Sequence, residues 1–401
     1  MKITACRNCG SQLLKEVINL GRMPLANSLL KSKDEAEEKF PLEVVFCEDC
    51  YLLQLTEIVP PEKMFSEYVY LSSCCETTLR NAKELAQKLI NLKNLNQNSF
   101  VVEIGSNDGY LLQYFVEKGI SVLGIEPAKN VAEIAIKKGV RTLPEFFSLE
   151  LAINLSKTQR ADVVIANNVL AHIPDIDGTI KGIAQILKED GLFVGEVPYA
   201  KDLIDKNEFD TIYHEHLSYF SVSSLKNIFE SRGFKIVDIE YLPNIHGGSL
   251  RIFASPKGET GQNVLKMLEE EKRAGMQKIE YYRDFKARVE KIKETLRNLV
   301  AEIKDRGKTL AGYGASAKGT VLLNFCDIKP EFVADINPIK QGKFVPGVKV
   351  PIESPKKLIE RKPEYTLLLV WNIKEEVLKQ QEEYRKMGGK FIIPIPSPQV
   401  V

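Results

Sequence analysis

The chain has 401 residues, enough for two or three domains of ordinary size. Its hydrophobic content of 44%, charged content of 27% and net charge of +1 fit a globular protein and give no electrostatic reason to expect a nucleic acid or an anionic membrane as partner. No apolar run approaches the roughly 18 residues of a membrane span, and the N-terminus lacks the apolar core of a signal peptide. We therefore expect a cytoplasmic protein whose seven cysteines serve a purpose other than disulfide bonding.

Two Cys-x-x-Cys pairs lie near the start of the chain, Cys6 with Cys9 and Cys47 with Cys50. Each pair can place two thiolates on one metal ion, and together they complete a closed tetrahedral zinc site with no open position. A redox-active pair is the alternative when one Cys-x-x-Cys is considered alone. The two pairs together predict a structural Zn²⁺ ion that stabilises a small module, which we place at residues 1–65.

A short aromatic stretch follows this module. Tyr68 and Tyr70 alternate with apolar residues, so an extended backbone would place both tyrosines on one side. They can form an aromatic packing patch or part of a binding site. A helix is predicted next, over residues 76–94.

A strand, a glycine loop, a helix and a second strand are predicted over residues 100–126. Residues 100–104 form a short apolar, β-branched run that is typical of a buried parallel strand. The second strand, 121–125, ends at Glu126, where a carboxylate can accept hydrogen bonds from both ribose hydroxyls. Between them, the apolar face of an amphipathic helix carries Leu111, Leu112, Phe115 and Val116.

The glycine loop itself narrows the choice of nucleoside. A dinucleotide-binding loop has a second glycine where this chain has Asn107, and Asp108 stands at the helix start, where a carboxylate would repel a pyrophosphate but not a ligand with an amino-acid tail. The loop resembles that of class I S-adenosylmethionine (SAM) methyltransferases, so we predict SAM as cofactor in preference to a strand, turn and helix without a ligand. The residues expected at the cofactor are Glu103, Gly105, Asn107, Asp108, Gly109, Glu126 and Pro127.

A further buried strand, 161–166, ends in Asn167 and Asn168 and is followed by His172. Ligands bind at the carboxyl ends of strands in such sheets, so these three side chains should face the cofactor crevice. A lone histidine is usually structural, but the position of His172 favours a functional role. The next elements are predicted at 177–188, a helix, and 191–198, a strand.

The segment Tyr213-His-Glu-His216 concentrates titratable side chains. It can be a metal site built from His214, Glu215 and His216, an aromatic core strand, or a general acid–base cluster. A metal would find too few ligands here, and burial of so many unpaired titratable groups would be unfavourable. We favour the acid–base cluster, because histidine titrates near neutral pH. Methylation of carbon requires a carbanion, so a base beside a SAM crevice predicts a C-methyltransferase.

The glycine turn and strand that begin at His246 close the methyltransferase domain, which we place at residues 66–258. Residues 261–306 are rich in lysine, glutamate, arginine and leucine. They predict one or two long solvated helices that link this domain to the last one.

The last part of the chain, 259–401, is predicted as a second α/β unit. Gly314, Ser316 and Lys318 lie on a loop between a strand and a helix, and Asp335 follows the next strand, where a ribose-binding acid is expected. Because this loop carries a lysine and no acid, it suits a pyrophosphate, in a crevice separate from that for SAM. A glycine turn used only for packing is the alternative.

Taken in order, these motifs resemble those of sugar C-methyltransferases that act on nucleotide-linked 4-keto-6-deoxysugars. The likeness extends from Cys6 to Asp335. It implies an α/β protein in which the doubly wound sheet of a class I SAM methyltransferase is preceded by a zinc-binding module and followed by a Rossmann-like domain. It also implies methylation at C3 of a nucleotide-diphosphate sugar, with dTDP as the expected nucleotide.

The resemblance further implies roles for particular residues. The base that removes the C3 proton is expected to be His216. The residues expected to assist it are Tyr213, Glu215 and His172. Those expected to bind the substrate are Tyr68 or Tyr70, His246, Arg251, Gly314, Ser316, Lys318 and Asp335. The pair Cys74-Cys75 departs from the family pattern, which has small or polar residues there.

Three other functions remain open. An NAD-dependent nucleotide-sugar enzyme would use the C-terminal loop, and a non-catalytic zinc scaffold would bind neither ligand. A small-molecule O-methyltransferase would transfer the methyl group without exchanging a substrate C–H. We expect a monomer or a small homo-oligomer.

Overall fold

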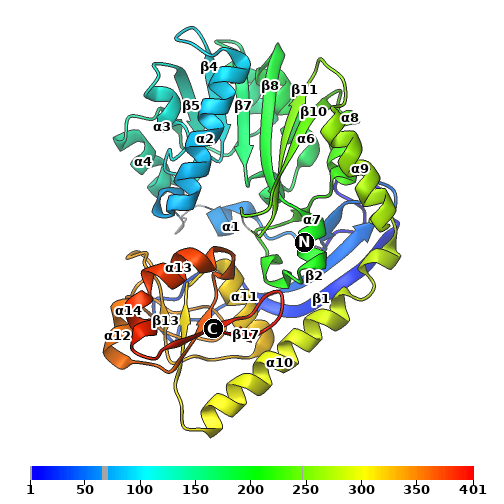
Figure 1. Cartoon of the computed structure of the whole chain (residues 1–401). Coiled ribbons are helices and arrows are strands. Elements are labelled where there is room, and N and C mark those ends of the chain that lie inside the picture. The colour runs from blue at the N-terminus through cyan, green and yellow to red at the C-terminus, as the bar shows by residue number, and fades with distance from the viewer. Residues whose placement is uncertain (1, 66–70, 246) are drawn as a thin grey trace.

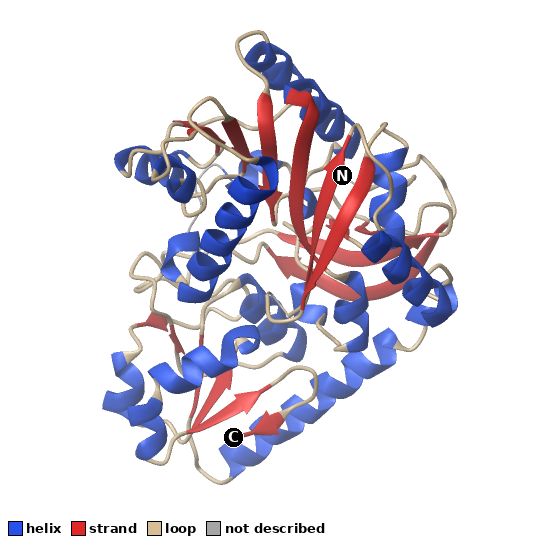
Figure 2. Cartoon of the chain, turned by 45° about the horizontal axis from the view of Figure 1, so that its top comes forward, coloured by secondary structure: helices blue, strands red, loops and turns tan. Residues whose placement is uncertain are grey.

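The computed structural model describes residues 2–65, 71–245 and 247–401, which contain three β-sheets (Figures 1 and 2). In Figure 1 the seven-stranded sheet lies at the top, the six-stranded sheet at the bottom, and the N-terminal sheet at the right between them. The predicted ligand-binding residues Tyr68, Tyr70 and His246 lie outside the described residues. None of the described helices is both long and apolar enough to cross a membrane.

The N-terminal sheet is antiparallel and has four strands, in the order β1-β2-β3-β9. Their bounds are β1 Leu14–Pro24, β2 Lys39–Cys47, β3 Leu53–Leu55 and β9 Ser218–Tyr219. The fourth strand thus comes from far along the chain, directly after the segment 213–216. The N-terminal module is completed by the residues that follow the predicted acid–base cluster.

The second sheet has seven strands in the order β10-β11-β8-β7-β4-β5-β6. All neighbours pair in parallel except β11, which is antiparallel to both β10 and β8. The strand order reverses between β4 and β7, so the sheet is doubly wound. Its strands are β4 Phe100–Ile104, β5 Ser121–Ile125, β6 Thr142–Leu143, β7 Ala161–Asn167, β8 Leu187–Pro198, β10 Lys235–Leu242 and β11 Ser249–Ser255.

Helices cover both faces of this sheet, which is why its central strands read as unbroken apolar runs. One face is packed by α2 Glu76–Lys93, α3 Gln113–Val116 and α4 Lys129–Lys137. The other is packed by α5 Leu149–Ser156, α6 Ile176–Ile186 and α8 Val222–Glu230. The short helices α1 Pro61–Phe65 and α7 Ala200–Asp205 lie at its carboxyl edge.

The amphipathic helix expected after Gly109 is shorter than predicted. The backbone first makes tight turns, with Gly109 N–H bonded to Ser106 O at 3.1 Å, so α3 has only four residues. Phe115 packs in the core as expected, but Val116, predicted on the same face, is 38% exposed. The prediction for Val116 was wrong because the helix ends at that residue.

The third sheet has six strands in the order β14-β13-β12-β15-β16-β17, parallel except for β17. This is a doubly wound order with its reversal between β12 and β15, which confirms the predicted Rossmann-like unit. The strands are β12 Leu310–Tyr313, β13 Val333–Ala334, β14 Ile352–Glu353, β15 Tyr365–Leu368, β16 Lys390–Ile393 and β17 Gln399–Val400. The helices are α11 Ala317–Cys326, α12 Lys356–Arg361, α13 Lys374–Gln380 and α14 Glu382–Lys386.

Two helices, α9 Gln262–Ala274 and α10 Phe285–Asp305, join the second sheet to the third. The expectation that they are solvated linkers was wrong for one face of each. Figure 1 shows α10 running beside β1, and it buries a stripe against the N-terminal and third sheets. The stripe, spaced by three and four residues, consists of Phe285, Val289, Ile292, Leu296, Val300 and Ile303.

Candidate active site

A cavity of about 710 Å³ lies where the three sheets meet. Its wall includes Gly105 and Glu126 of the second sheet, His216 beside the N-terminal sheet, and Lys318 of the third. The two crevices expected to be separate therefore open into the same space. This volume is sufficient for a cofactor and a substrate side by side.

The loop after β4 is shaped for close contact with a ligand. Gly105 has a φ of 65°, and a Cβ there would lie 2.5 Å from Val169 Cγ2, so only glycine fits. Glu126, at the end of β5, accepts hydrogen bonds from the backbone N–H groups of Asn107 at 3.0 Å and Ala128 at 2.9 Å. Burial raises the pKa of Glu126, and these two N–H groups oppose the rise. Each carboxylate oxygen keeps a lone pair for a hydroxyl of the ligand.

Some of the residues predicted to bind SAM line the cavity directly, and others lie behind them. The lining residues of this set are Gly105, Asn107, Glu126, Pro127, Asn167 and Asn168. Asp108 is buried behind the loop, where it pairs with Lys138 at 3.0 Å and accepts a hydrogen bond from Ser73. Gly109 has a φ of 76° and packs against Val140.

Glu103 is fully buried at the end of β4, and neither of its carboxylate oxygens has a hydrogen-bond partner among the described residues. Burial, together with the negative charges of Glu126 and Asp108, raises the pKa of Glu103 well above its ordinary value. A positive charge close to this buried acid would oppose the rise and favour its ionised form.

The segment after β7 carries a second group of cavity residues. Asn168 adopts a left-handed φ of 56° and donates its N–H to Glu196 O at 2.7 Å. The oxygen of the Asn167 side chain is buried and has no partner within the described part of the chain. His172 ends the 3-10 helix η2, Leu170–His172, and burial lowers its pKa to about 4. It is therefore a neutral imidazole at physiological pH.

Tyr213 and His216 face each other in a turn rather than on a strand. The Tyr213 hydroxyl lies 2.7 Å from His216 Nε2, and His216 Nδ1 lies 2.9 Å from the carbonyl oxygen of Thr211. A carbonyl oxygen can only accept, so Nδ1 carries the proton and Nε2 accepts from the tyrosine. The His172 ring lies edge-on to His216, with centroids 5.0 Å apart. Both Tyr213 and His216 line the cavity.

The other two members of this segment, His214 and Glu215, contact residues of the N-terminal module. His214 Nε2 lies 3.2 Å from the carbonyl oxygens of Phe40 and Pro41, and burial lowers the pKa of His214. Glu215 accepts a hydrogen bond from the amide of Asn27 at 2.7 Å. The turn therefore separates the side chains of the alternative metal site, and it also excludes the aromatic core strand.

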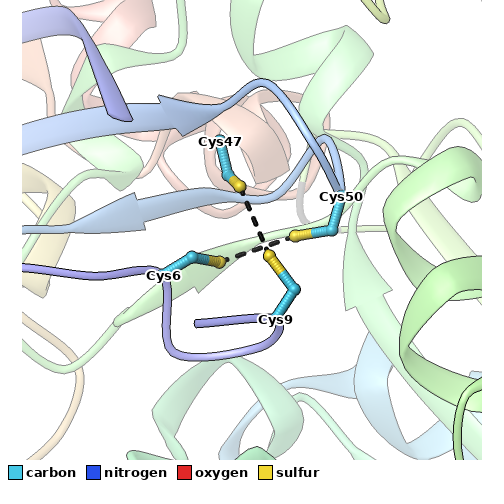
Figure 3. A group of neighbouring side chains, drawn as sticks. All are labelled: Cys6, Cys9, Cys47 and Cys50. Atoms are coloured by element: carbon cyan, nitrogen blue, oxygen red, sulfur yellow. Dashed lines mark hydrogen bonds between the residues drawn. The ribbon is translucent and has the colours of Figure 1, made fainter. Parts of the chain in front are cut away.

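The four cysteines of the two Cys-x-x-Cys pairs converge (Figure 3). The Sγ atoms of Cys6 and Cys50 lie 3.5 Å apart and those of Cys9 and Cys47 lie 3.6 Å apart. A tetrahedral zinc ion with bonds of about 2.3 Å requires sulfur separations close to these. Within residues 2–65, 71–245 and 247–401, this is the group of side chains that fits a metal ion. The site is structural because all four positions are thiolates.

Gln54 supports the zinc site from β3. Its side-chain amide donates to Cys6 Sγ at 3.1 Å, and its oxygen accepts the backbone N–H of Arg7 at 3.0 Å. Such contacts fix the orientation of a metal ligand.

The edge of the third sheet completes the cavity. Gly314 has a φ of 91°, and a Cβ there would meet Val370 at 2.6 Å. Ser316 caps α11 by accepting from Gly319 N–H at 3.1 Å. Lys318 Nζ lies 4.6 Å above the ring of Trp371. Gly314, Ser316, Lys318 and Asp335, which the sequence predicts to bind a nucleotide, all line the cavity.

Arg251, predicted to bind substrate, lies outside the cavity wall. It is buried and donates to Glu196 at 2.9 Å, to Asn81 at 2.7 Å and to Glu240 at 3.1 Å. Its charge neutralises Glu196, which does line the cavity. The geometry thus gives Arg251 an anchoring role behind the cofactor crevice.

Several cavity residues were missed by sequence reasoning. They are Asn27, Glu196, Asn337, Lys340 and Asn372. Lys340 could have been predicted from the sequence, because a basic residue five positions after a ribose-binding acid can reach the same ligand. The others come from elements whose packing alone brings them to the cavity.

The doubly wound sheet, the glycine loop with its acid at the end of β5, and the four-cysteine zinc site define a class I SAM-dependent methyltransferase with a zinc-binding module. Three family models match in order: "Putative zinc binding domain" over residues 6–65, "Methyltransferase domain" over 77–239 and "C-methyltransferase C-terminal domain" over 244–396. C-methyltransferase NovU of Streptomyces niveus is 39% identical over 408 residues, covering 100% of this chain and 97% of that protein. The chain belongs to this C-methyltransferase family.

More distant matches cover only part of the chain. Ubiquinone biosynthesis O-methyltransferase of Rhodopseudomonas palustris (strain HaA2) is 29% identical over 123 residues, 30% of this chain and 46% of that protein. Among solved structures, magnesium protoporphyrin IX methyltransferase (ChlM) from Synechocystis PCC 6803 with bound SAM matches with a TM-score of 0.33 and 15% identity, over 44% of this chain and 78% of that one.

The protein is therefore a SAM-dependent C-methyltransferase that carries a structural zinc ion. The predicted cofactors, SAM and Zn²⁺, are confirmed. The O-methyltransferase, NAD-dependent and scaffold alternatives are set aside.

Proposed function

We propose that this enzyme methylates C3 of a nucleotide-diphosphate-linked 4-keto deoxysugar, with dTDP as the nucleotide. The observation that carries the proposal is the hydrogen-bonded series Tyr213–His216–Thr211 in a cavity shared by the cofactor loop and a lysine-bearing nucleotide loop. A base in that position is needed for methylation of carbon.

The proton step depends on the tautomer of His216. The Thr211 carbonyl keeps the proton on Nδ1, so Nε2 is the acceptor. The 4-keto group acidifies the C3–H bond; the proton passes to the Tyr213–His216 pair and ends on Nε2, and the bonding electrons form an enolate with its charge on the C4 oxygen. The imidazolium that results is stabilised by the same carbonyl oxygen.

His172 is better suited to the enolate oxygen than to the proton. With its pKa lowered to about 4 it is a weak base, but a neutral imidazole can still donate an N–H. Its ring lies against His216, so the base and the donor can act on adjacent atoms of one sugar.

SAM, when bound, supplies an electrophilic methyl group. Gly105, Asn107 and Glu126 would hold its nucleoside, since the glycine leaves room and the acid keeps lone pairs for the ribose. The buried, unpartnered oxygen of Asn167 offers a further acceptor among the described residues.

The diphosphate of the substrate is assigned to the third sheet. The backbone N–H groups at the start of α11 and the ammonium of Lys318 favour an anion there. Asp335 would accept from the ribose.

We further propose domain limits at 1–65, 66–258 and 259–401, and a monomer or small homo-oligomer in the cytoplasm. The support for a reducing compartment is that the described cysteines form thiolate ligands or free thiols rather than disulfides.

The test uses dTDP-4-keto-6-deoxyglucose and its 2-deoxy relative in D₂O. Without SAM, the enzyme should exchange the C3 proton for deuterium; with SAM, it should add a methyl group at C3, both measured by mass spectrometry and NMR. His216→Asn should abolish exchange and methylation while SAM still binds.

His214→Asn is the matched control, because His214 belongs to the same segment but contacts the carbonyls of Phe40 and Pro41. It should keep the exchange activity. Exchange at the wild-type rate by His216→Asn would refute the base assignment. Neither exchange nor methylation by the wild-type enzyme, with SAM bound, would refute the substrate class.

A further inference from the structure

The indole of Trp371 contacts a buried acid in the segment between β8 and β9. Trp371 is the one tryptophan in the chain, and its Nε1 donates to Asp210 Oδ2 at 2.7 Å. It begins the 3-10 helix η5, Trp371–Ile373, after β15. Asp210 is fully buried in another 3-10 helix, η3, Phe209–Thr211. This hydrogen bond therefore joins the nucleotide-binding unit to the segment that precedes the proposed base.

The residue after Asp210 is Thr211, whose carbonyl oxygen holds His216 Nδ1 at 2.9 Å. The residue before it, Phe209, packs against Phe325 of α11, with ring centroids 5.2 Å apart. The helix η3 is thus held on both sides by helices of the C-terminal unit, η5 and α11. Its last carbonyl determines which nitrogen of His216 can accept a proton.

Lys318 connects the same pair to the proposed diphosphate site. Its ammonium lies 4.6 Å above the Trp371 ring. Burial raises the pKa of Asp210 to about 6 and that of Glu208 to about 7, and the charge of Lys318 opposes both rises. An anion bound at Lys318 would therefore act on a lysine that contacts Trp371 and whose charge influences Asp210.

We propose that Trp371 and Asp210 are a positioning pair through which the nucleotide-binding unit holds Thr211, and hence His216, in the proton-accepting arrangement. Neither residue touches the reacting atoms. Proton abstraction then depends on correct packing of the C-terminal unit against η3. This inference rests on the proposed role of His216 as base.

The main test compares two variants with the wild-type enzyme. Trp371→Phe keeps an aromatic ring under Lys318 but removes the N–H donor. It should lower the rate of C3 deuterium exchange without SAM by roughly 10- to 100-fold, because small misplacements of a base have effects of this size, and it should leave the SAM dissociation constant unchanged. Asp210→Asn keeps an oxygen that can accept from the indole, so it should exchange faster than Trp371→Phe.

The matched control is Tyr384→Phe. The Tyr384 hydroxyl of α14 accepts a buried hydrogen bond from Thr366 Oγ1 at 2.8 Å and donates to the carbonyl oxygen of Pro363 at 2.8 Å, both contacts within the C-terminal unit. Its loss weakens the same unit without releasing Asp210, so exchange should stay at the wild-type rate.

A second readout does not require the substrate. The chain has four histidines, so ¹⁵N spectra of labelled protein can follow each ring, with His216 assigned by comparison with His216→Asn. The wild-type His216 should show the Nδ1–H tautomer, and Trp371→Phe should show a mixture of tautomers and an altered pH titration. Tyr384→Phe should match the wild type.

The possible outcomes separate the two proposals. Wild-type exchange and a wild-type His216 spectrum in Trp371→Phe would overturn the positioning role, and so would equal losses in Trp371→Phe and Tyr384→Phe. If the wild-type enzyme exchanges no C3 proton, the proposed substrate chemistry fails. The positioning of His216 is then still decided by the tautomer spectra.

Discussion

The carboxylate of Glu126 accepts a hydrogen bond from the backbone N–H of Asn107 at 3.0 Å, so the acid at the end of β5 is tied to the glycine loop after β4. The same arrangement recurs in the third sheet, where Asp335 accepts from the backbone N–H of Ala315 at 2.8 Å. Each acid also accepts from the N–H two residues further along its own loop. Two sheets thus present a loop and an acid to one cavity in the same way.

Isosteric substitutions should separate the two ligands. Glu126→Gln should raise the dissociation constant of SAM by about 10- to 100-fold, because hydrogen bonds to a charged acceptor contribute about 1.5–3 kcal/mol. Asp335→Asn should weaken binding of a nucleoside diphosphate by a similar factor and leave SAM binding unchanged. Calorimetry measures the binding of SAM. The fluorescence of Trp371, near the proposed diphosphate site, measures the binding of the nucleoside diphosphate. Normal SAM binding by Glu126→Gln would contradict the role of the acid.

Glu103 should make the stability of the cofactor-free protein fall as pH rises. Its pKa in the fold is raised well above the ordinary value, so the folded state holds a proton that the unfolded chain releases. The free energy of unfolding then decreases from the ordinary glutamate pKa upward, through the raised pKa. Glu103→Gln should remove the part of this decrease that Glu103 contributes, an effect of about 1–3 kcal/mol, the usual penalty for a buried unpaired group. The raised pKa values of Glu126, Asp210 and Glu208 leave a smaller pH dependence in the variant. Urea unfolding at about pH 5 to 8 measures it.

The control for Glu103→Gln is Glu133→Gln, at an exposed position on α4, which should keep the wild-type pH dependence. SAM carries a positive sulfonium, so its affinity for the wild-type protein should rise with pH as Glu103 ionises. A pH-independent SAM affinity would show that the charge of Glu103 is not used by the cofactor.

The sequence predicts the two doubly wound sheets well, because parallel strands buried on both faces leave unbroken apolar runs and because left-handed loop positions demand glycine. Gly105 and Gly314 illustrate the second point, since a Cβ at either would collide with a valine. Spacing alone also predicts the zinc site, since four cysteines in two pairs have few other uses. These features are local in the chain.

Features that depend on distant parts of the chain escape such prediction. The turn at 213–216 places His214 against the N-terminal module and His216 beside Tyr213. The alternation of side chains along a strand would instead place both histidines on one side. Arg251 is neutralised by Glu196, a partner 55 positions away. The packing of α10 against both the N-terminal and the third sheet uses an apolar stripe that lies among many charged residues in the sequence.

The Arg251–Glu196 ion pair should be important for stability. Both side chains are buried, with exposures of 6% and 2%, so removal of the arginine leaves a carboxylate without its charge partner. Arg251→Met should lower the free energy of unfolding by about 3–5 kcal/mol, and adding Glu196→Gln should restore part of the loss. Lys257→Met, which breaks an exposed pair with Glu189, should have no measurable effect. Equal urea midpoints for Arg251→Met and Lys257→Met would contradict this account.

Removal of zinc should loosen the segment that carries His216. Gln54 binds Cys6 and pairs in register with Ser218, and the carbonyl of Leu217 accepts from the backbone of Leu55 at 3.0 Å and from the side chain of Arg7. The zinc site thus holds β3, and β3 holds the strand next to the base. Binding of structural zinc contributes about 10–16 kcal/mol in small peptides, so its loss should unfold this sheet locally.

Hydrogen exchange followed by mass spectrometry can test this coupling. After chelation or Cys47→Ser, residues 6–55 and 213–219 should lose protection together, by at least roughly tenfold in rate, while the strands within 100–125 keep theirs. Cys326→Ser is the control, because Cys326 is a buried thiol of α11 outside the zinc site and its loss should release no zinc. Since β9 has only β3 as a strand partner among the described residues, protection of 213–219 that survives zinc removal would mean that η2 and η3 hold the base without the N-terminal sheet.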